Sequence, residues 1–174
     1  MNNLSEKRFS IGDIVQIEGV LIGVVEQIDL RSTLVRGFDQ IPRYVPNSDL
    51  SNAVVLNYSH RNNYRVQLRI GYVLSLSDAQ IADVCDALRD HLLHSGDFSS
   101  LENAPKHVYV EGLSDSAIAV MFYAWTNNSD YQEYLQVSER LTLKILETSR
   151  RSDAPLAYPT QTLHVAPVPE AGAA

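Results

Sequence analysis

The sequence contains little cysteine and little lysine. Its one cysteine, Cys85, excludes a disulfide within the chain and a metal centre built from several thiolates. A reducing compartment is compatible with this composition. Lysine occurs only at Lys7, Lys106 and Lys144, so the other basic residues are arginines, which favour fixed ion pairs and interfaces.

Long hydrophobic runs are also absent. The longest apolar run is Ala117–Trp125, whereas a membrane-spanning helix needs about 20 predominantly apolar residues. The first residues, MNNLSEKR, lead directly into a strand pattern and lack the apolar segment of a signal peptide. We therefore expect neither a membrane-spanning helix nor a signal peptide within these residues.

The sequence also lacks an excess of positive charge. The 21 acidic residues outnumber the 14 basic residues, and the formal net charge is −7. This balance argues against general binding to a nucleic-acid backbone. The 174 residues are 45% hydrophobic and 20% charged, which is typical of one or two ordinary globular domains.

Residues 9–59 carry short β-rich segments separated by turn residues. The apolar groups are Ile14/Val15/Ile17, Val20–Val25, Thr33/Val35, Tyr44/Val45 and Val54–Tyr58. This close spacing predicts a small, strongly bent sheet or barrel, with a turn at Pro46-Asn47-Ser48-Asp49. Gly19 and Gly23 are positions where such a sheet bends or where two backbones approach closely.

From residue 64 onward the pattern predicts the order β-α-β-β-α-β. The strands are expected at residues 64–72, 106–113, 117–126 and 160–165, and the helices at 77–95 and 131–149. Ser77 with Gln80, and Asp130 with Glu133, resemble capping boxes at the two helix starts. This order is that of a split βαβ, ferredoxin-like domain.

Two further features concern individual strands of this second part. The segment at 117–126 is almost continuously apolar, which predicts a central strand covered on both faces. The segment Arg151–Ala154 reads as a loose polar link, and Pro159 directly precedes the last strand. The link and the proline suit a last strand that departs from its own domain, whereas the β-α-β-β-α-β pattern alone places it in that domain's sheet.

The residues of the first part also form an ordered set that resembles a known family. The set is Phe9, Gly12-Asp13, Val15, Gly19, Gly23, Val25, Ile28, Arg31-Ser32-Thr33, Arg36, Asp39, Val45-Pro46-Asn47, Asn57 and Ser59. It is similar to the β domain that follows the pore-lining helix of small-conductance mechanosensitive ion channels. A weaker similarity continues through Val110, Leu113, Ser116-Ala117-Ile118, Trp125, Asp130-Tyr131 and Ala157-Tyr158-Pro159. Two stretches depart from the family pattern: Asp39-Gln40, where the family often has Asp-Gly, and Gly71–Leu74.

The resemblance implies an α+β fold in which a small Sm-like β domain is followed by a ferredoxin-like α/β domain. The expected parts are an N-terminal segment (1–8), the β domain (9–59), the α/β domain (60–157), a C-terminal strand (158–165) and a flexible tail (166–174). The resemblance also implies that the C-terminal strand joins those of six other subunits in an intersubunit barrel.

The function that the resemblance implies is physical. The chain is expected to form the cytoplasmic vestibule of a mechanosensitive channel, at the cytoplasmic face of the cell membrane. There it supports the pore and admits ions during hypo-osmotic pressure release, in a homo-oligomer of seven subunits attached through upstream helices. No enzymatic activity, cofactor or nucleic acid is expected. The alternatives are a natural soluble paralogue, or a soluble regulatory or RNA-binding module supported by fold analogy alone.

Single residues offer little chemistry of their own. His91 and His94 on the first helix are candidate metal ligands, but a helix C-terminus also favours histidines there. The carboxylates Asp78, Asp83, Asp86 and Asp90 on the same helix are typical of a solvated face. Cys85 falls in the apolar stripe, which favours a core residue over a nucleophile. We therefore predict no catalytic, cofactor-binding or metal-binding residues.

Overall fold

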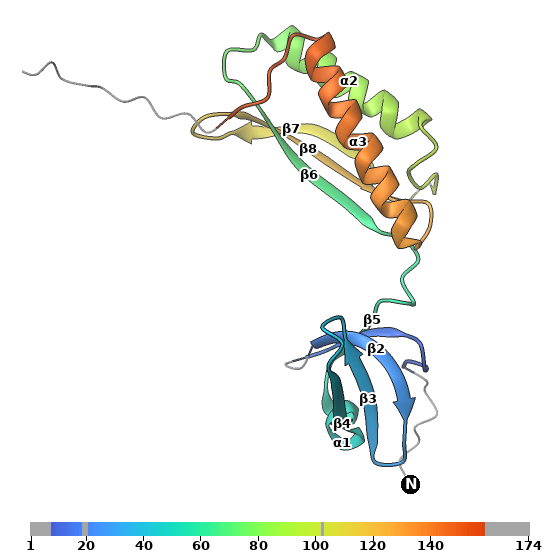
Figure 1. Cartoon of the computed structure of the whole chain (residues 1–174). Helices are drawn as coiled ribbons and strands as arrows, with labels where there is room; N and C mark the ends of the chain where they lie inside the picture. Colours follow the sequence, from blue (N-terminus) through green and yellow to red (C-terminus); the bar gives the residue numbers. More distant parts are fainter. Residues whose placement is uncertain (1–7, 19–20, 102, 159–174) are drawn as a thin grey trace, which may run out of the picture. The chain divides into compact units, whose positions relative to one another are not determined.

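The computed structural model describes residues 8–18, 21–101 and 103–158, and the chain divides into two units, 1–64 and 65–174. They are called here the β unit and the α/β unit (Figure 1). The predicted boundary at residues 59/60 lies a few residues before this division. Both units contain antiparallel sheets, which confirms the α+β class. Within the described ranges, no helix is long and apolar enough to cross a bilayer.

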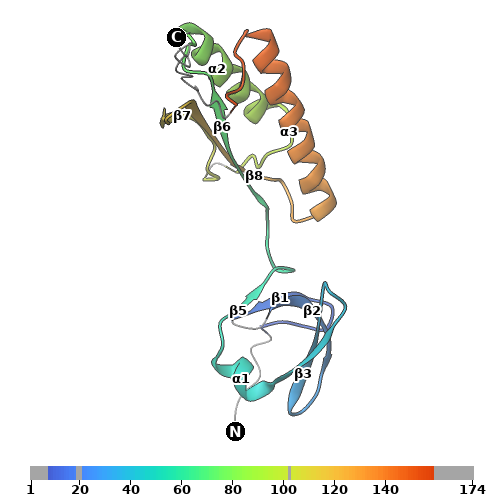
Figure 2. The ribbon, with the colours of Figure 1, turned by 60° about the vertical axis from the view of Figure 1, so that its left-hand side comes forward.

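The β unit is a single curved antiparallel sheet (Figure 2). Its strands are β1 (Ile14–Ile17), β2 (Leu21–Ile28), β3 (Ser32–Gly37), β4 (Pro42–Pro46) and β5 (Val55–Asn57). They lie in the order β4-β3-β2-β1-β5. Residues on β1 and β3 alternate between buried and half-buried, so one face of the sheet encloses the core. That core consists of Val15, Ile17, Val25, Val35, Val45 and Leu50.

Gly23 allows β2 and β3 to approach each other closely. A Cβ atom at Gly23 would lie 2.4 Å from the carbonyl oxygen of Arg36 and 2.9 Å from Cγ1 of Val35. Both distances are shorter than any van der Waals contact, so only glycine fits at this position. The predicted close approach at Gly23 is confirmed, whereas Gly19 lies outside the described residues.

The predicted turn at Pro46–Asp49 is wrong, because these residues begin a short helix, α1 (Asn47–Asn52). Pro46 has φ −57° and ψ 135° and acts as the N-cap residue, and the Ala53 N–H donates to the Asp49 carbonyl 2.9 Å away. The helix forms because it carries Leu50 into the core, where only 6% of the side chain remains exposed. Tertiary packing therefore determines a conformation that the polar local sequence does not indicate.

The α/β unit has the predicted order β-α-β-β-α over its described residues. Its elements are β6 (Arg65–Tyr72), α2 (Asp78–His94), β7 (His107–Leu113), β8 (Ile118–Trp125) and α3 (Tyr131–Arg151). The three strands are antiparallel and lie in the order β6-β8-β7. The β7–β8 hairpin closes where the Ser114 N–H donates to the Ala117 carbonyl at 2.8 Å.

The two helices start as the sequence predicts, with one difference. Ser77 and Gln80 form a complete capping box at α2. At α3, the Asp130 carboxylate accepts from the Glu133 N–H at 2.7 Å, but the Glu133 side chain accepts from Asn128 instead of returning to the Asp130 backbone. The Asp130 N–H instead donates to Oδ1 of Asn128 at 3.0 Å, so Asn128 completes this cap.

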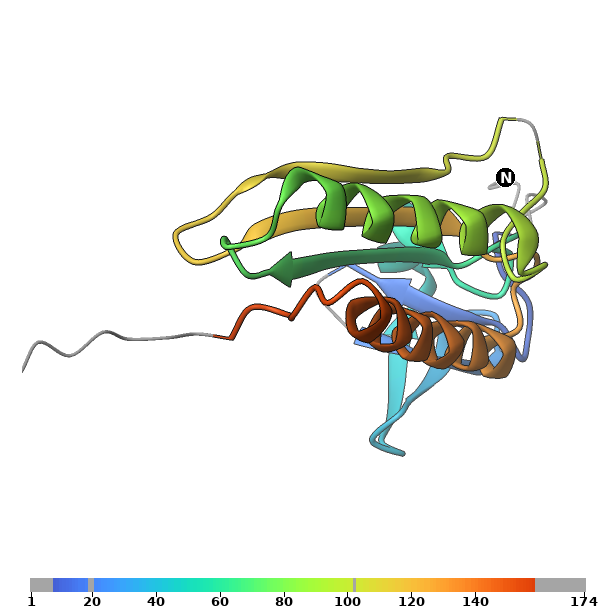
Figure 3. The same ribbon diagram turned by 90° about the horizontal axis from the view of Figure 1, so that it is seen from above.

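Both helices cover the same face of the sheet (Figure 3). The core between them contains Val66, Ile70, Tyr72, Val108, Val120, Phe122 and Ala124 from the strands, and Val84, Cys85, Leu88, Leu92, Val137, Leu141 and Ile145 from the helices. The central position predicted for β8 is confirmed, but its coverage on both faces is wrong. Its outward side chains Met121, Tyr123 and Trp125 are only half-buried, because no helix of the described residues lies over them.

The chain after α3 is ordered, so the predicted loose link at residues 151–154 is also wrong. α3 extends through Arg151, Ala154 is fully buried, and the Ser149 hydroxyl donates to the Ala154 carbonyl at 2.6 Å. Leu156 then pairs antiparallel with Tyr72 at the end of β6, and the Ala157 N–H donates to the Gly71 carbonyl at 2.8 Å. The strand and tail predicted at 160–165 and 166–174 lie outside the described residues, as does most of segment 1–8.

Candidate interaction surfaces

A polar network joins the first and last strands of the β unit. Nδ2 of Asn57 donates to the Asp13 carboxylate at 2.8 Å and to the Arg8 carbonyl at 3.1 Å. Oγ of Ser59 accepts from the Ile14 N–H at 2.9 Å. Burial alone would raise the pKa of Asp13, but the hydrogen bonds from Asn57 and the Ser10 N–H outweigh it and lower the pKa.

A second network holds the β2–β3 hairpin against the end of β4. The Thr33 hydroxyl donates to Oδ1 of Asn47 at 2.9 Å, and Nδ2 of Asn47 donates to the Asp29 carbonyl at 2.9 Å. The Asn47 N–H donates to the Arg31 carbonyl at 2.9 Å. One asparagine thus binds three separate points of the hairpin, which explains why an asparagine stands at the start of α1.

Two ion pairs lie on the surface of the same unit. Arg36 binds Glu26 with its Nε 2.5 Å from Oε1 and also donates to the Gln40 carbonyl at 2.9 Å. Arg43 binds Asp39 at 2.9 Å. Gln40 has φ +65°, a conformation that glycine adopts without strain, so Gln40 keeps the turn geometry of the more common Asp-Gly. The signature residues Asp13, Thr33, Arg36, Asp39, Asn47 and Asn57 all bind other parts of the unit, and their role here is structural.

The outer strands of the β unit provide the first candidate interaction surface. β4 and β5 end the sheet order, so each has one edge that pairs with no strand among the described residues. Exposed apolar side chains accompany them: Tyr44 is 68% exposed and Leu56 is 50% exposed. Unpaired edges with apolar side chains are ready templates for pairing with another chain.

The second candidate surface is the side of the α/β sheet that faces away from the helices, called here the open sheet face. It is formed by Arg65 and Arg69 of β6, Tyr123 and Trp125 of β8, and His107 and Tyr109 of β7. Its rings lie near one another, with centroids 6.1 Å apart between His107 and Tyr123 and 6.4 Å apart between Tyr123 and Trp125. Sequence periodicity did not reveal this face, because β8 is apolar on both of its sides.

The two candidate histidine ligands of α2 are not brought together with a third ligand. His94 lies 2.9 Å from the Asp90 carboxylate at the exposed helix end. His91 packs edge-to-face on Phe98 with a centroid distance of 6.0 Å, and its Nε2 atom is buried. Burial lowers the pKa of His91. Among the described residues, no group of three or more His, Cys, Asp or Glu side chains is arranged to hold a metal ion.

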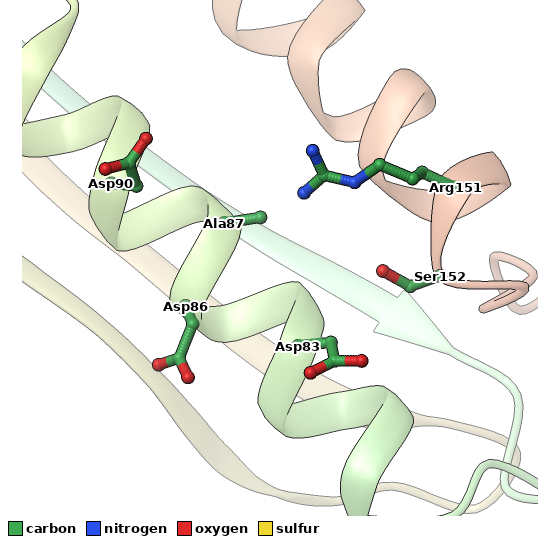
Figure 4. A pocket seen from close by; sticks show the side chains of 6 residues that line it. All are labelled: Asp83, Asp86, Ala87, Asp90, Arg151 and Ser152. Atoms are coloured by element: carbon green, nitrogen blue, oxygen red, sulfur yellow. The ribbon is translucent and has the colours of Figure 1, made fainter.

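The helix carboxylates line an open groove rather than an enclosed pocket. Asp83, Asp86 and Asp90 of α2 border it, and the Arg151 side chain extends from the end of α3 toward them (Figure 4). Asp86 is bound by Arg89 of the same helix at 2.6 Å. The three carboxylates are exposed, and no convergent polar groups surround a substrate-sized space, so the groove has the features of a solvated helix face.

Cys85 lies in the buried stripe of α2 as predicted. It is 3% exposed, and burial raises its pKa, so the thiol stays protonated and unreactive at neutral pH. The neighbouring Tyr72 is fully buried, and burial raises its pKa to about 12. Both groups therefore act as neutral core residues.

Comparison with known proteins relates the sequence to channel proteins. Residues 1–60 match the family described as "Mechanosensitive ion channel, beta-domain". An uncharacterized MscS family protein of Aquifex aeolicus is 31% identical over 96% of this chain and 45% of that protein. The low conductance mechanosensitive channel YnaI of Escherichia coli is 31% identical over 92% of this chain and 46% of that protein. The chain thus spans less than half the length of these relatives.

Solved structures share the fold at lower sequence identity. The cryo-EM structure of Arabidopsis thaliana MSL1 A320V superposes with a TM-score of 0.80, at 19% identity, over 90% of this chain and 58% of that chain. The crystal structure of Helicobacter pylori MscS in a closed state gives a TM-score of 0.72, at 19% identity, over 92% of this chain and 60% of that chain. Residues 1–60 thus belong to the β-domain family of mechanosensitive ion channels, and the sequence relationship to MscS family proteins extends over both units.

Proposed function

We propose that this chain is the vestibule-forming part of a mechanosensitive channel subunit, lying on the cytoplasmic side of the cell membrane. The observation that carries the proposal is sequence similarity over 92% of the chain to a protein described as a mechanosensitive channel. In this role the chain supports the pore, and the assembled vestibule admits ions when the channel opens under hypo-osmotic pressure. The proposed subunit also contains upstream helices that cross the membrane and form the pore.

Each of the two units can be assigned to a known fold. We assign an Sm-like fold to the β unit, supported by its five-stranded curved sheet and short helix. We assign a ferredoxin-like fold to the α/β unit, supported by its β-α-β-β-α order and by the sheet order β6-β8-β7. The domain limits proposed from the sequence, 9–59 and 60–157, follow these assignments.

The assembly is proposed to contain seven copies. The free edges of β4 and β5 support it, because a strand at one edge of a unit can pair with the opposite edge of the next unit. Residues 158–165 are proposed to leave the α/β unit and form an intersubunit barrel. Deleting residues 158–174 should then reduce the oligomer while leaving thermal unfolding of the α/β unit unchanged. Unfolding of that unit on deletion would show instead that the strand belongs to its own sheet.

The proposed function is tested by survival of osmotic downshock. The longer subunit that contains this chain is expressed in a bacterial strain without mechanosensitive channels, and the cells are diluted rapidly from high to low osmolarity. The subunit is expected to raise survival, and a subunit lacking residues 9–157 is expected not to, with both confirmed in the membrane by immunoblotting. Equal survival with the intact subunit and with an empty vector would contradict the proposal.

A further inference from the structure

The open sheet face gathers aromatic side chains on a surface that no helix of the described residues covers. Tyr109 is 55% exposed, and Met121, Tyr123 and Trp125 are half-buried beside it. Helices cover the opposite side of the same three strands, whereas no helix of the described residues covers these aromatic side chains. Contiguous exposed apolar patches of this kind mark interaction sites.

The open sheet face is basic, whereas the chain as a whole is acidic. Arg65, Arg69 and His107 contribute to it, and Glu111 is the acidic side chain that pairs with Arg69 there, with Nε 2.8 Å from Oε2. The Arg69 side chain remains 63% exposed in this pair. The whole chain carries seven more acidic than basic residues, which disfavours a nucleic acid as the partner and favours an acidic protein surface.

The same chain carries such an acidic surface on the outer side of α2. Asp83, Asp86 and Asp90 are exposed along this helix, and Asp83 forms no ion pair with the described residues. The pairs of Asp86 with Arg89 and of Asp90 with His94 lie on the surface, where ion pairs contribute little and are easily exchanged. A second copy of the chain therefore offers the charge that the open sheet face complements.

We propose that the open sheet face binds the acidic outer side of α2 from a second copy of this chain. Because the two surfaces differ, the contact is head-to-tail. An open row of copies therefore keeps an unpaired open sheet face at one end and an unpaired outer side of α2 at the other. Repetition around an axis closes such contacts into a ring. The inference rests on the proposed function, because it assigns the contact between α/β units within the proposed assembly.

Trp125 provides a direct probe, because it is the one tryptophan of the chain and lies in the open sheet face. The full 174-residue chain is measured over a concentration series by light scattering and by tryptophan emission with acrylamide quenching. As the average molar mass rises with concentration, the emission maximum of Trp125 is expected to shift to the blue and its quenching by acrylamide to fall. High salt should reverse both changes. A rising mass with unchanged Trp125 emission would overturn the proposed interface while leaving assembly through other surfaces intact.

Reversing the charges on the two surfaces tests the proposed contact between them. Arg65→Glu, at an exposed position paired with Trp125 across the strands, should abolish the concentration-dependent blue shift. Adding Asp83→Arg to the same chain should restore it, whereas Arg150→Glu, an equal charge change on α3, should leave it unchanged. Thermal unfolding followed by circular dichroism checks that each variant folds, since substitutions at exposed positions change stability little.

Two results would show that the open sheet face has another partner or is covered within one chain, and either would overturn the proposal. Quenching of Trp125 by single-stranded oligouridylate without self-association would indicate a nucleic-acid partner. Emission already blue-shifted at the lowest concentration and insensitive to dilution in the monomer would show that the face is covered within one chain. Failure of the longer subunit to protect cells from downshock, with the Trp125 shift and the charge rescue intact, would contradict the proposed function and not this interface.

Discussion

The two units of this chain hold their folds together in different ways. Among its described residues, the β unit encloses six buried apolar residues and adds hydrogen bonds from side chains distant in sequence, such as Asp13 with Asn57 and Thr33 with Asn47. The α/β unit encloses sixteen of its described residues in a core between one face of a sheet and two helices. A hydrogen bond requires particular residue types at both ends, whereas an apolar core accepts many combinations of similar volume.

This difference explains why the first unit is recognisable by its residues and the second by its pattern. In the β unit the polar partners Asp13, Asn47 and Asn57 and the close approach at Gly23 each require one residue type, and together they form an ordered signature. In the α/β unit the periodicity of β6, α2 and α3 is sufficient, because any residue of suitable size fills the core. Substitutions in the two units should therefore have different consequences.

The largest expected effect comes from the core of the α/β unit. Phe122→Ala removes a fully buried side chain of β8 and should lower the free energy of unfolding of that unit by about 3–5 kcal/mol. Trp125 fluorescence during urea denaturation reports on this unit. Hydrogen exchange of the β unit should be unchanged, and an equal loss of protection in both units would break the comparison by showing that they unfold as one.

The next effect tests the close approach in the β unit. Gly23→Ala should destabilise that unit by about 2–3 kcal/mol, because the new Cβ meets the Arg36 carbonyl. Gly12→Ala is the matched control: its Cβ meets nothing within 4 Å, so it incurs only the cost of φ +94°, about 1–2 kcal/mol. Hydrogen exchange of β2 and β3 measures both. Equal losses in the two variants would mean that contact with β3 does not restrict position 23.

Acid should destabilise the α/β unit before the β unit. Burial lowers the pKa of His91 in the folded state below the value of about 6.5 of an unfolded chain, so below pH 6.5 the unfolded state binds more protons. The stability of the α/β unit should be constant above that pH and fall below it. The pKa of Asp13 in the β unit is also lowered from 3.8, so its contribution is lost only in stronger acid.

Replacing His91 separates its contribution from that of other groups. His91→Gln should flatten the pH dependence of Trp125-monitored unfolding between pH 5 and about 6.5. His94→Gln, at the exposed end of the same helix, should leave the slope as it is. An unchanged slope in the His91 variant would place the acid sensitivity elsewhere among the groups near it, which are Asp90, Asp97, Arg140 and Lys144.

The smallest expected effect concerns ions in the proposed vestibule. Acidic residues outnumber basic ones by six to three in residues 9–59 and by thirteen to nine in residues 60–165. A ring of copies enriches cations inside it, over a range of about 8–10 Å at physiological salt. The reversal potential of the intact channel under a salt gradient should indicate neutral-to-cation preference at low salt that fades at high salt. Anion preference that grows as salt falls would show that arginines line the interior.

Much of the fold follows from local sequence, and the exceptions have physical causes. The starts of α2 and α3 are predictable from their caps and apolar period, and the turn at Ser114–Ser116 is predictable from the spacing of the two strands beside it. The helix α1 is not, because its polar residues read as a turn until Leu50 finds the core. The order at residues 154–157 depends on a hydrogen bond to Ser149 and pairing with β6, which no local pattern contains.

The candidate surfaces are less predictable than the fold. The amino-acid types on β8 do not tell which side the helices cover, so the open sheet face emerges only from the tertiary structure. The free edges of β4 and β5 can likewise be identified only when the order of the strands in the sheet is known. By contrast, the positions of Cys85 and of the α2 carboxylates follow from the sequence, because the apolar period places Cys85 in the core and the carboxylates outside it. The sequence did not indicate the position of His91, which packs against Phe98 with its Nε2 atom buried.

The central proposal, that this chain is part of a channel opened by membrane tension, is tested most directly by patch-clamp recording. The longer subunit that contains the chain is expressed in cells lacking their own mechanosensitive channels, and suction is applied to excised patches. We predict stepwise currents that appear above a threshold of suction, and none in patches from cells expressing this 174-residue chain alone. Patches that contain the longer subunit in the membrane but show no current up to the lytic tension would contradict the account.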